Sequence, residues 1–292
     1  MSHPTFCPRL ASVCCAALAA LAGCQTTHPK KFADILNPAE IAKMVAPSNV
    51  RNWMPALAVM PTAEQNGNWL TVHNIRNCQY LSDRDCVVRH YDKTFDLYRV
   101  QGVDFIVVPF KDSPSLAHTM LSFSFGDEGY LAVSVEARLE EGETYTPLKG
   151  ALRQYELMYV VADERDVIGL RAKHRHDDVY LFHSRASPEQ ARVLLLDMLA
   201  RANKLAVQPE FYDTFSNNCT TNLVNHVNRL SPGRVPPNIG ILLPGYSDRL
   251  AYDLGLLDTR LTFEKAKRQA NITRLANRYD DSPDFSRKIR QL

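Results

Sequence analysis

The stretch SLAHTMLSFSFGDEGYLAVSVEAR, residues 115–138, predicts a β-hairpin. Its two halves, 117–125 and 130–138, are rich in the apolar, β-branched and aromatic residues that strands favour. The four residues between them, GDEG, suit a tight hairpin turn.

The hairpin carries a histidine whose neighbours follow from the register. If Phe125 faces Tyr130, a slip of one residue places Glu136 or Arg138 beside His118 on the same face. We expect Glu136 to orient the His118 ring. The alternative is that Glu136 is a surface carboxylate or is paired with Arg138. Arg138 is itself a candidate for binding an anionic part of a substrate.

Strand patterns precede the hairpin and helical patterns follow it. The upstream strands lie between Trp69 and Phe110, and the clearest helix spans 188–205, with Ser187 as its cap. A second helix begins near Cys219. This order of elements predicts an α+β fold.

Three stretches are less patterned. Residues 55–68 are rich in breakers and predict a linker, and residues 152–162 fit either a helix or a strand. The polar, basic tail from Leu257 predicts a peripheral helix or partial disorder.

Composition narrows the function classes. The 292 residues carry 34 Lys+Arg against 32 Asp+Glu, a net charge of +2, so no nucleic-acid partner is expected. No run of 18 apolar residues follows the first thirty positions, which excludes a multi-span membrane protein. No Walker A or dinucleotide glycine fingerprint is present, and we expect neither a cofactor nor a metal.

The N-terminus resembles a bacterial lipoprotein signal. An apolar segment after Arg9 ends in LAGC at Cys24, so residues 1–23 are the expected signal peptide and Cys24 the lipidated residue. Gln25 favours the outer membrane, by analogy with enterobacterial lipoproteins. Residues 24–68 then form a tether and an N-terminal helical segment. An ordinary secretory signal and a buried helix with a chance cysteine are the alternatives.

The cysteine count singles out one thiol. Cys78 and Cys86 flank a turn-forming segment, so a hairpin places them within reach of a disulfide in an oxidising compartment. Once the leader is cut and Cys24 carries lipid, Cys219 is left unpaired. An unpaired thiol in an exported protein needs an explanation.

Cys219 lies in FSNNCTTN, at the expected start of a helix. There the unpaired N–H groups and the helix dipole stabilise a thiolate and an adjacent oxyanion. Asn218 and Tyr212 are candidates for oxyanion or positioning contacts. The alternative is a buried cysteine that only packs.

A nucleophilic thiol needs a base, and His118, at the edge of a strand after a proline-containing loop, is the best candidate. His226 is two helical turns from Cys219 and too far away. His174 and His176 lie in a charged turn without further metal ligands nearby.

These residues resemble two related families. His118 on a strand before NNCTTN (217–222) resembles the circularly permuted NlpC-type papain-like hydrolases and acyltransferases. More closely, the motifs YDKTFDL, VDFIVVPF, AHTMLSFSF, VSVEAR, GETY, YVVADERDVIGLR and FYDTFSNNCTTN resemble the Lnb N-terminal periplasmic domain, a domain of unknown function. The resemblance covers about 69–235, which leaves 236–292 as a C-terminal extension.

Together these features predict an outer-membrane lipoprotein facing the periplasm, with a papain-like α+β domain. Cys219 attacks an amide, ester or thioester of a membrane lipid or of peptidoglycan, and His118 takes and returns the proton. The alternatives are a non-catalytic binding or scaffold module with the same fold, and a thiol redox role, which the lack of a CxxC motif near Cys219 disfavours.

The lipoprotein signal makes the first prediction. Cys24→Ala should release the protein from membranes as an unprocessed or soluble form, because multiple acyl chains on one residue are what anchors it. Membrane fractionation and intact mass measure this. Unchanged fractionation and mass would show that Cys24 is not the anchor.

Overall fold

A mostly antiparallel sheet runs through residues 46–291, the part of the chain that our computed structural model describes. Seven strands follow the order β1-β2-β9-β8-β7-β6-β10, and β5 also pairs with β2. β3 and β4 form a separate hairpin. The strands are β1 (Thr62–Asn66), β2 (Trp69–Arg76), β3 (Gln79–Tyr80), β4 (Cys86–Val87), β5 (His90–Asp96), β6 (Gly102–Phe110), β7 (Ser113–Ser124), β8 (Tyr130–Arg138), β9 (Glu156–Ala162) and β10 (Tyr180–His183).

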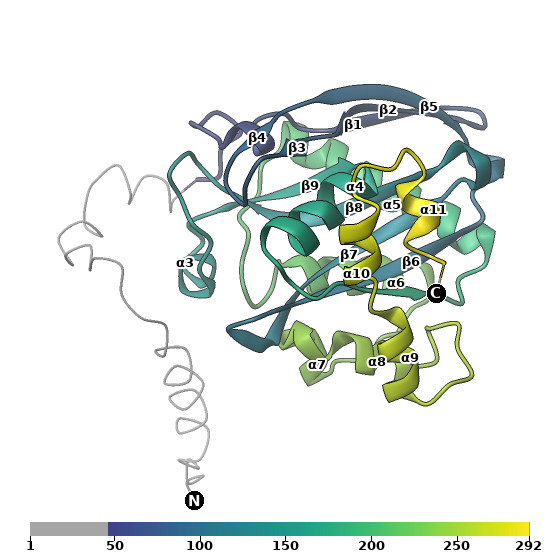
Figure 1. Cartoon of the computed structure of the whole chain (residues 1–292). Helices are drawn as coiled ribbons and strands as arrows, with labels where there is room; N and C mark the ends of the chain where they lie inside the picture. The colour runs from purple at the N-terminus through teal and green to yellow at the C-terminus, as the bar shows by residue number, and fades with distance from the viewer. Residues whose placement is uncertain (1–45, 292) are drawn as a thin grey trace, which may run out of the picture. The chain divides into compact units, whose positions relative to one another are not determined.

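Helices cover both faces of this sheet, which confirms the α+β class (Figure 1). They are α3 (Pro147–Ala151), α4 (Glu164–Gly169), α5 (Pro188–Val207), α6 (Cys219–Leu230), α7 (Ile239–Leu242), α8 (Ser247–Asp253), α9 (Phe263–Ala270), α10 (Thr273–Arg278) and α11 (Phe285–Lys288). No helix within 46–291 is long and apolar enough to cross a bilayer. The predicted signal peptide, Cys24 and the helical segment up to Val45 lie outside the described residues.

The central hairpin forms as predicted, one residue away from the expected register. Ser124 pairs with Tyr130, and the last backbone pair toward the strand ends is Met120 with Ser134. The turn needs glycine at Gly126, whose φ is +63°. β7 then continues alongside β6 alone, so β7 and β8 separate beyond the last pair.

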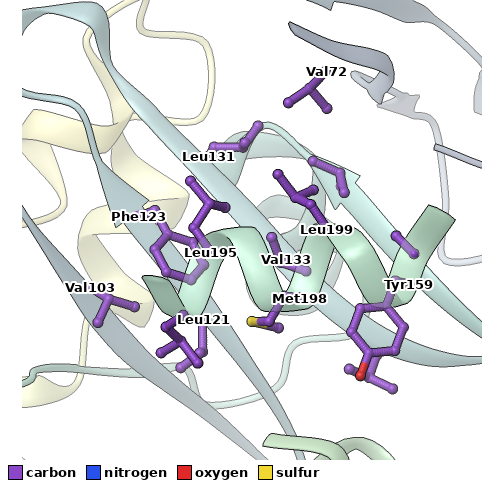
Figure 2. Packing of buried hydrophobic residues seen from close by; sticks show 14 of the residues in the cluster. Val72, Val103, Leu121, Phe123, Leu131, Val133, Tyr159, Leu195, Met198 and Leu199 are labelled. Atoms are coloured by element: carbon purple, nitrogen blue, oxygen red, sulfur yellow. The ribbon is translucent and has the colours of Figure 1, made fainter. Parts of the chain in front are cut away.

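Successive side chains of the hairpin point to opposite faces of the sheet, and each face has its own hydrophobic core. Leu121, Phe123 and Val133 pack against α5 and α6, and Figure 2 shows α5 lying over them through Leu195 and Met198. The intervening residues, such as Met120, face α4, α10 and α11. The predicted helix 188–205 is confirmed as α5, whose start is fixed by a capping box between Ser187 and Gln190.

One expectation about local structure needs correction, and the structure decides one segment that the sequence leaves open. Part of the predicted linker 55–68 is strand β1, which pairs with β2 along its whole length, so the folded part begins before Trp69. The ambiguous segment 152–162 contains a fully buried strand, β9, at the centre of the sheet. A run that is apolar on both faces has no strand periodicity to detect.

The cysteine hairpin forms, but without its disulfide. Tyr80 pairs with Cys86 across β3 and β4, and the Cys86 thiol is in hydrogen-bond contact with Cys78. Both residues are free thiols in the structure. The Cys78–Cys86 disulfide therefore stays a prediction for protein exported into an oxidising compartment.

The C-terminal tail forms helices, as one of the two expected alternatives had it, but it is docked into the core and is not peripheral. Phe285 and Ile289 are fully or nearly fully buried in the core beside α4. Arg290 donates to Asp104 at 2.7 Å and to Glu164 at 2.5 Å, and both carboxylates are buried. The tail is docked by widely spaced apolar residues and by one arginine. Because these residues follow no clear period, the sequence does not predict that the tail docks.

The tail makes the second prediction. Arg290→Ala should lower the free energy of unfolding by about 3 kcal/mol or more, because it leaves the buried Glu164 without its cation and Asp104 with the partly exposed His183 alone. Arg287→Ala is the matched control: its partner Asp127 is exposed, so the loss should stay below about 1 kcal/mol. Chemical denaturation measures the free energy of unfolding of both variants. An equal loss of stability in the two variants would refute a structural role for Arg290.

Candidate functional site

A cavity of about 190 Å³ opens where β7 and β8 separate. Five of the six residues predicted to take part in catalysis or substrate binding line it: Cys219, His118, Glu136, Tyr212 and Asn218. Pockets of about 310 and 580 Å³ lie elsewhere, but none of these five residues lines either of them. The smaller cavity is therefore the candidate site.

Cys219 is the first residue of α6, as the sequence predicts. The Asn218 side chain accepts from the Thr221 N–H at 2.9 Å, and the Thr221 hydroxyl in turn accepts from the Asn218 N–H. The Cys219 Sγ is 3.9 Å from the Ala117 carbonyl and 3.8 Å from the Thr220 hydroxyl. This capping box holds the thiol against the strand that carries His118.

Two further contacts position these elements. The Thr220 hydroxyl is 3.1 Å from that of Thr119, which pins the start of α6 to β7. A short helical turn, η6 (Pro244–Tyr246), covers the free edge of β7, and a Cβ at Gly245 would lie 2.0 Å from the Pro114 carbonyl. Only glycine fits this close approach.

His118 belongs to a hydrogen-bonded chain of three side chains. Its Nε2 is 2.7 Å from the Ser134 hydroxyl, which donates to Glu136 at 2.6 Å. The Ser134 hydroxyl has a single proton and gives it to Glu136, so it accepts from His118. Nε2 therefore carries the ring proton of the neutral imidazole, and Nδ1 is left as the proton acceptor.

Electrostatics keeps this chain in one protonation state. Burial and the nearby Arg171 and Arg175 lower the pKa of His118 to about 3, although Glu136 opposes this. Burial would raise the pKa of Glu136, but His118 and Arg171, which donates to it at 2.8 Å, hold it well below its usual range. At neutral pH the pair is a neutral imidazole beside a carboxylate.

No hydrogen bond joins the Cys219 thiol to the His118 ring within the described part of the chain. Alternation along β7 explains this. Thr119 faces α6, whereas His118 and Met120 face the opposite side of the sheet. The two side chains meet at the cavity because the strands have separated there.

Two tyrosines border the thiol. The hydroxyls of Tyr212 and Tyr145 are 3.3 Å apart, and both rings line the cavity. Burial raises the pKa of Tyr212, and the charge of a Cys219 thiolate raises it further, so the phenol stays protonated and able to donate. Asn218 is less available, because its amide also donates to the Thr214 carbonyl at 2.6 Å.

Arg138 does not line the cavity, which contradicts its assignment to substrate binding. Its guanidinium donates to the carbonyls of Leu57 and Ala58 and to the Asn49 side chain, and it stacks on Trp53 at 4.1 Å. It ties the N-terminal segment to β8. The register that brings Glu136 to His118 directs Arg138 to the same side, but the chain before β1 occupies that space.

His226 holds the helix and does not act at the cavity. Its ring is 2.6 Å from Asp197 of α5 and 2.7 Å from the Tyr159 hydroxyl, which donates to Asn222. This buried network fixes α6 between α5 and β9. It agrees with the expectation that His226 is not the base for Cys219.

Three residues of the site are missing from the sequence prediction: Tyr145 and Arg171, which line the cavity, and the buried Ser134, which bonds to His118 and Glu136. Ser134 is two residues before Glu136 in the strand, so alternation alone places it on the same face. Tyr145 lies in the GETY motif. Arg171 ends the motif YVVADERDVIGLR, but its contact with Glu136 arises from the packing of α4 and the turn after it, which no local pattern predicts. Among residues 46–291 no group of three His, Cys, Asp or Glu side chains is arranged to hold a metal ion.

Comparison with known proteins agrees with the motif resemblance. A search of curated proteins and a search of solved structures found no significant match. The family model of the Lnb N-terminal periplasmic domain matches residues 88–243, more than half of the chain, including His118, Glu136 and Cys219. The chain therefore belongs to the Lnb N-terminal periplasmic domain family.

Proposed function

We propose that this protein is a cysteine-dependent hydrolase or acyltransferase with Cys219 as nucleophile and His118 as base. The observation that carries the proposal is that both side chains line one cavity while the Ser134–Glu136 chain leaves the His118 Nδ1 as a proton acceptor. An imidazole with one nitrogen held by Ser134 and the other free is oriented to accept a proton from the thiol.

The reaction follows from these positions. As the substrate enters, Nδ1 takes the thiol proton and the sulfur attacks the carbonyl carbon of an amide, ester or thioester. The N–H groups at the start of α6 and the Tyr212 hydroxyl hold the resulting oxyanion. Nδ1–H protonates the leaving group, which leaves a thioester on Cys219. Water or an amine then attacks the thioester, gives its proton to His118, and the thiol is restored.

The step needs a small rearrangement, because the thiol and the ring are not hydrogen-bonded in this structure. Catalytic hydrogen bonds are often long or absent before the substrate binds. The Cys219 thiol is already 3.9 Å from the carbonyl of Ala117, the residue before His118. We expect substrate binding to shift the start of α6 or the strand before His118 so that Nδ1 reaches the sulfur while Nε2 keeps its bond to Ser134.

The arrangement fits a circularly permuted papain-like enzyme. The nucleophile begins a helix packed on an antiparallel sheet, and the histidine comes earlier in the chain, on a strand of that sheet. The periplasmic family and the lipoprotein-like N-terminus support an anchor in the outer membrane through Cys24, with a membrane lipid or peptidoglycan as substrate.

A labelling experiment tests the pair without a known substrate. In reduced protein, where Cys78 is a free thiol, iodoacetamide should alkylate Cys219 much faster than Cys78, whose pKa burial and Asp166 raise to about 12. His118→Ala should slow labelling of Cys219 by about tenfold or more, because the thiol loses its base. Ser134→Ala should have a smaller effect, since Ser134 only orients the ring. Peptide-level mass spectrometry gives the rate at each cysteine.

The pH dependence sharpens this test. Because the pKa of His118 is lowered to about 3, the ring stays a neutral base as the solution is acidified, and the ratio of wild-type to His118→Ala rates should stay constant from about pH 8 to about pH 5. An ordinary histidine would lose its effect below about pH 6.5. His73→Ala, on the distant β2 strand, is the matched control. If the His118→Ala variant is stable and its Cys219 is alkylated at the wild-type rate, the catalytic proposal fails and the non-catalytic binding module is the alternative that stands.

The substrate class needs a cellular experiment. A Cys219→Ala strain should accumulate one uncleaved or unacylated envelope component, visible by untargeted lipid and muropeptide profiling against wild type. A change confined to lipids or to muropeptides assigns the substrate. Identical profiles in both fractions, with the variant present at wild-type levels, would argue against catalysis.

A further inference from the structure

Two arginines from one turn line the candidate catalytic cavity. Arg171 and Arg175 belong to the segment after α4, where the helix widens into a π-helical turn, η5 (Leu170–His174). Residues four apart in such a turn lie on the same side. π-Helical turns are frequent at functional sites because they redirect side chains that a regular α-helix would aim elsewhere.

Only one of these two arginines is neutralised. Arg171 donates to Glu136 at 2.8 Å and to the Val167 carbonyl. Arg76, which also lines the cavity, is paired with the buried Asp166 at 2.7 Å. The Arg175 guanidinium forms no hydrogen bond or ion pair with any other described residue.

The surroundings of Arg175 favour an anion. Arg175 is exposed at the mouth of the cavity, yet partial desolvation and the like charge of Arg171 lower its pKa, and Glu136 and Asp177 compensate only in part. An incoming anionic group would relieve the repulsion between the two guanidinium groups.

We propose that Arg175 is a specificity residue that binds an anionic group, a carboxylate or a phosphate, on the substrate that Cys219 attacks. This inference rests on the proposed function and narrows its substrate class. The planar guanidinium can hold two oxygens of either group at once, which fixes the substrate in orientation as well as in place. The substrate would thus carry its negative charge close to the reacting carbonyl, within the same cavity.

Two alkylating reagents of similar shape test this directly. Iodoacetate carries a carboxylate and iodoacetamide a neutral amide, so the ratio of their rates at Cys219 measures attraction of an anion to the cavity. Arg175→Gln should lower the iodoacetate rate by about threefold to fivefold relative to the iodoacetamide rate, the size expected for one partly solvated charge pair. Arg175→Lys should retain part of the preference.

Protection experiments identify the anion. At constant ionic strength, acetate and inorganic phosphate are each added during labelling with iodoacetamide. Protection of Cys219 by phosphate alone assigns a phosphate-bearing substrate, and protection by acetate alone assigns a carboxylate. Either protection should disappear in Arg175→Gln.

Arg185→Gln is the matched control. Arg185 is exposed and lines the other two pockets. The substitution Arg185→Gln therefore removes the same net charge without changing the candidate cavity. An equal fall in the iodoacetate rate for Arg185→Gln and Arg175→Gln, or an unchanged rate ratio in Arg175→Gln, would overturn the inference. The effect of His118→Ala on iodoacetamide labelling tests the catalytic pair separately. Failure of the anion-binding proposal is therefore distinguishable from failure of the catalytic proposal.

Discussion

Backbone pairing between β7 and β8 stops at Met120 and Ser134, and the candidate site depends on that separation. A closed hairpin would leave Cys219 and His118 on opposite faces of a continuous sheet. Because the strands diverge, one cavity receives the thiol from the α6 side and the imidazole from the other. The edge of β7 released in this way is covered by η6, where only glycine allows the close approach at Gly245.

Buried charges hold this arrangement in fixed pairs. Arg76 with Asp166, Arg171 with Glu136, and Arg290 with Asp104 and Glu164 each join segments that are far apart in the chain. A buried charge without its partner is costly, so such pairs specify where each segment docks. The Arg171–Glu136 pair has a second role. It keeps the Glu136 carboxylate ionised, so Ser134 donates to Glu136 and accepts from His118, which fixes the tautomer of the ring.

Local rules account for the parts of the site that lie within one element. Cap residues before an amphipathic run place Cys219 at the start of α6, and strand alternation brings Glu136 to within 3.4 Å of His118. The same alternation also suggests Arg138 as a neighbour of the histidine, which is wrong. The segment before β1 supplies carbonyl acceptors for Arg138, and no local pattern announces that a distant loop will occupy that position.

The α+β class, the hairpin, the capped helices and the family to which the chain belongs could all be predicted from the amino-acid sequence, since each depends on short-range periodicity, turn chemistry or ordered motifs. Which faces meet became clear from the folded chain alone. The docking of the C-terminal tail through Arg290, the burial of β9 and the convergence of Arg171 and Arg175 on the cavity are contacts between segments far apart in the chain. Such contacts are selected by shape and by charge neutralisation across the whole fold, and neither leaves a periodic trace in the sequence.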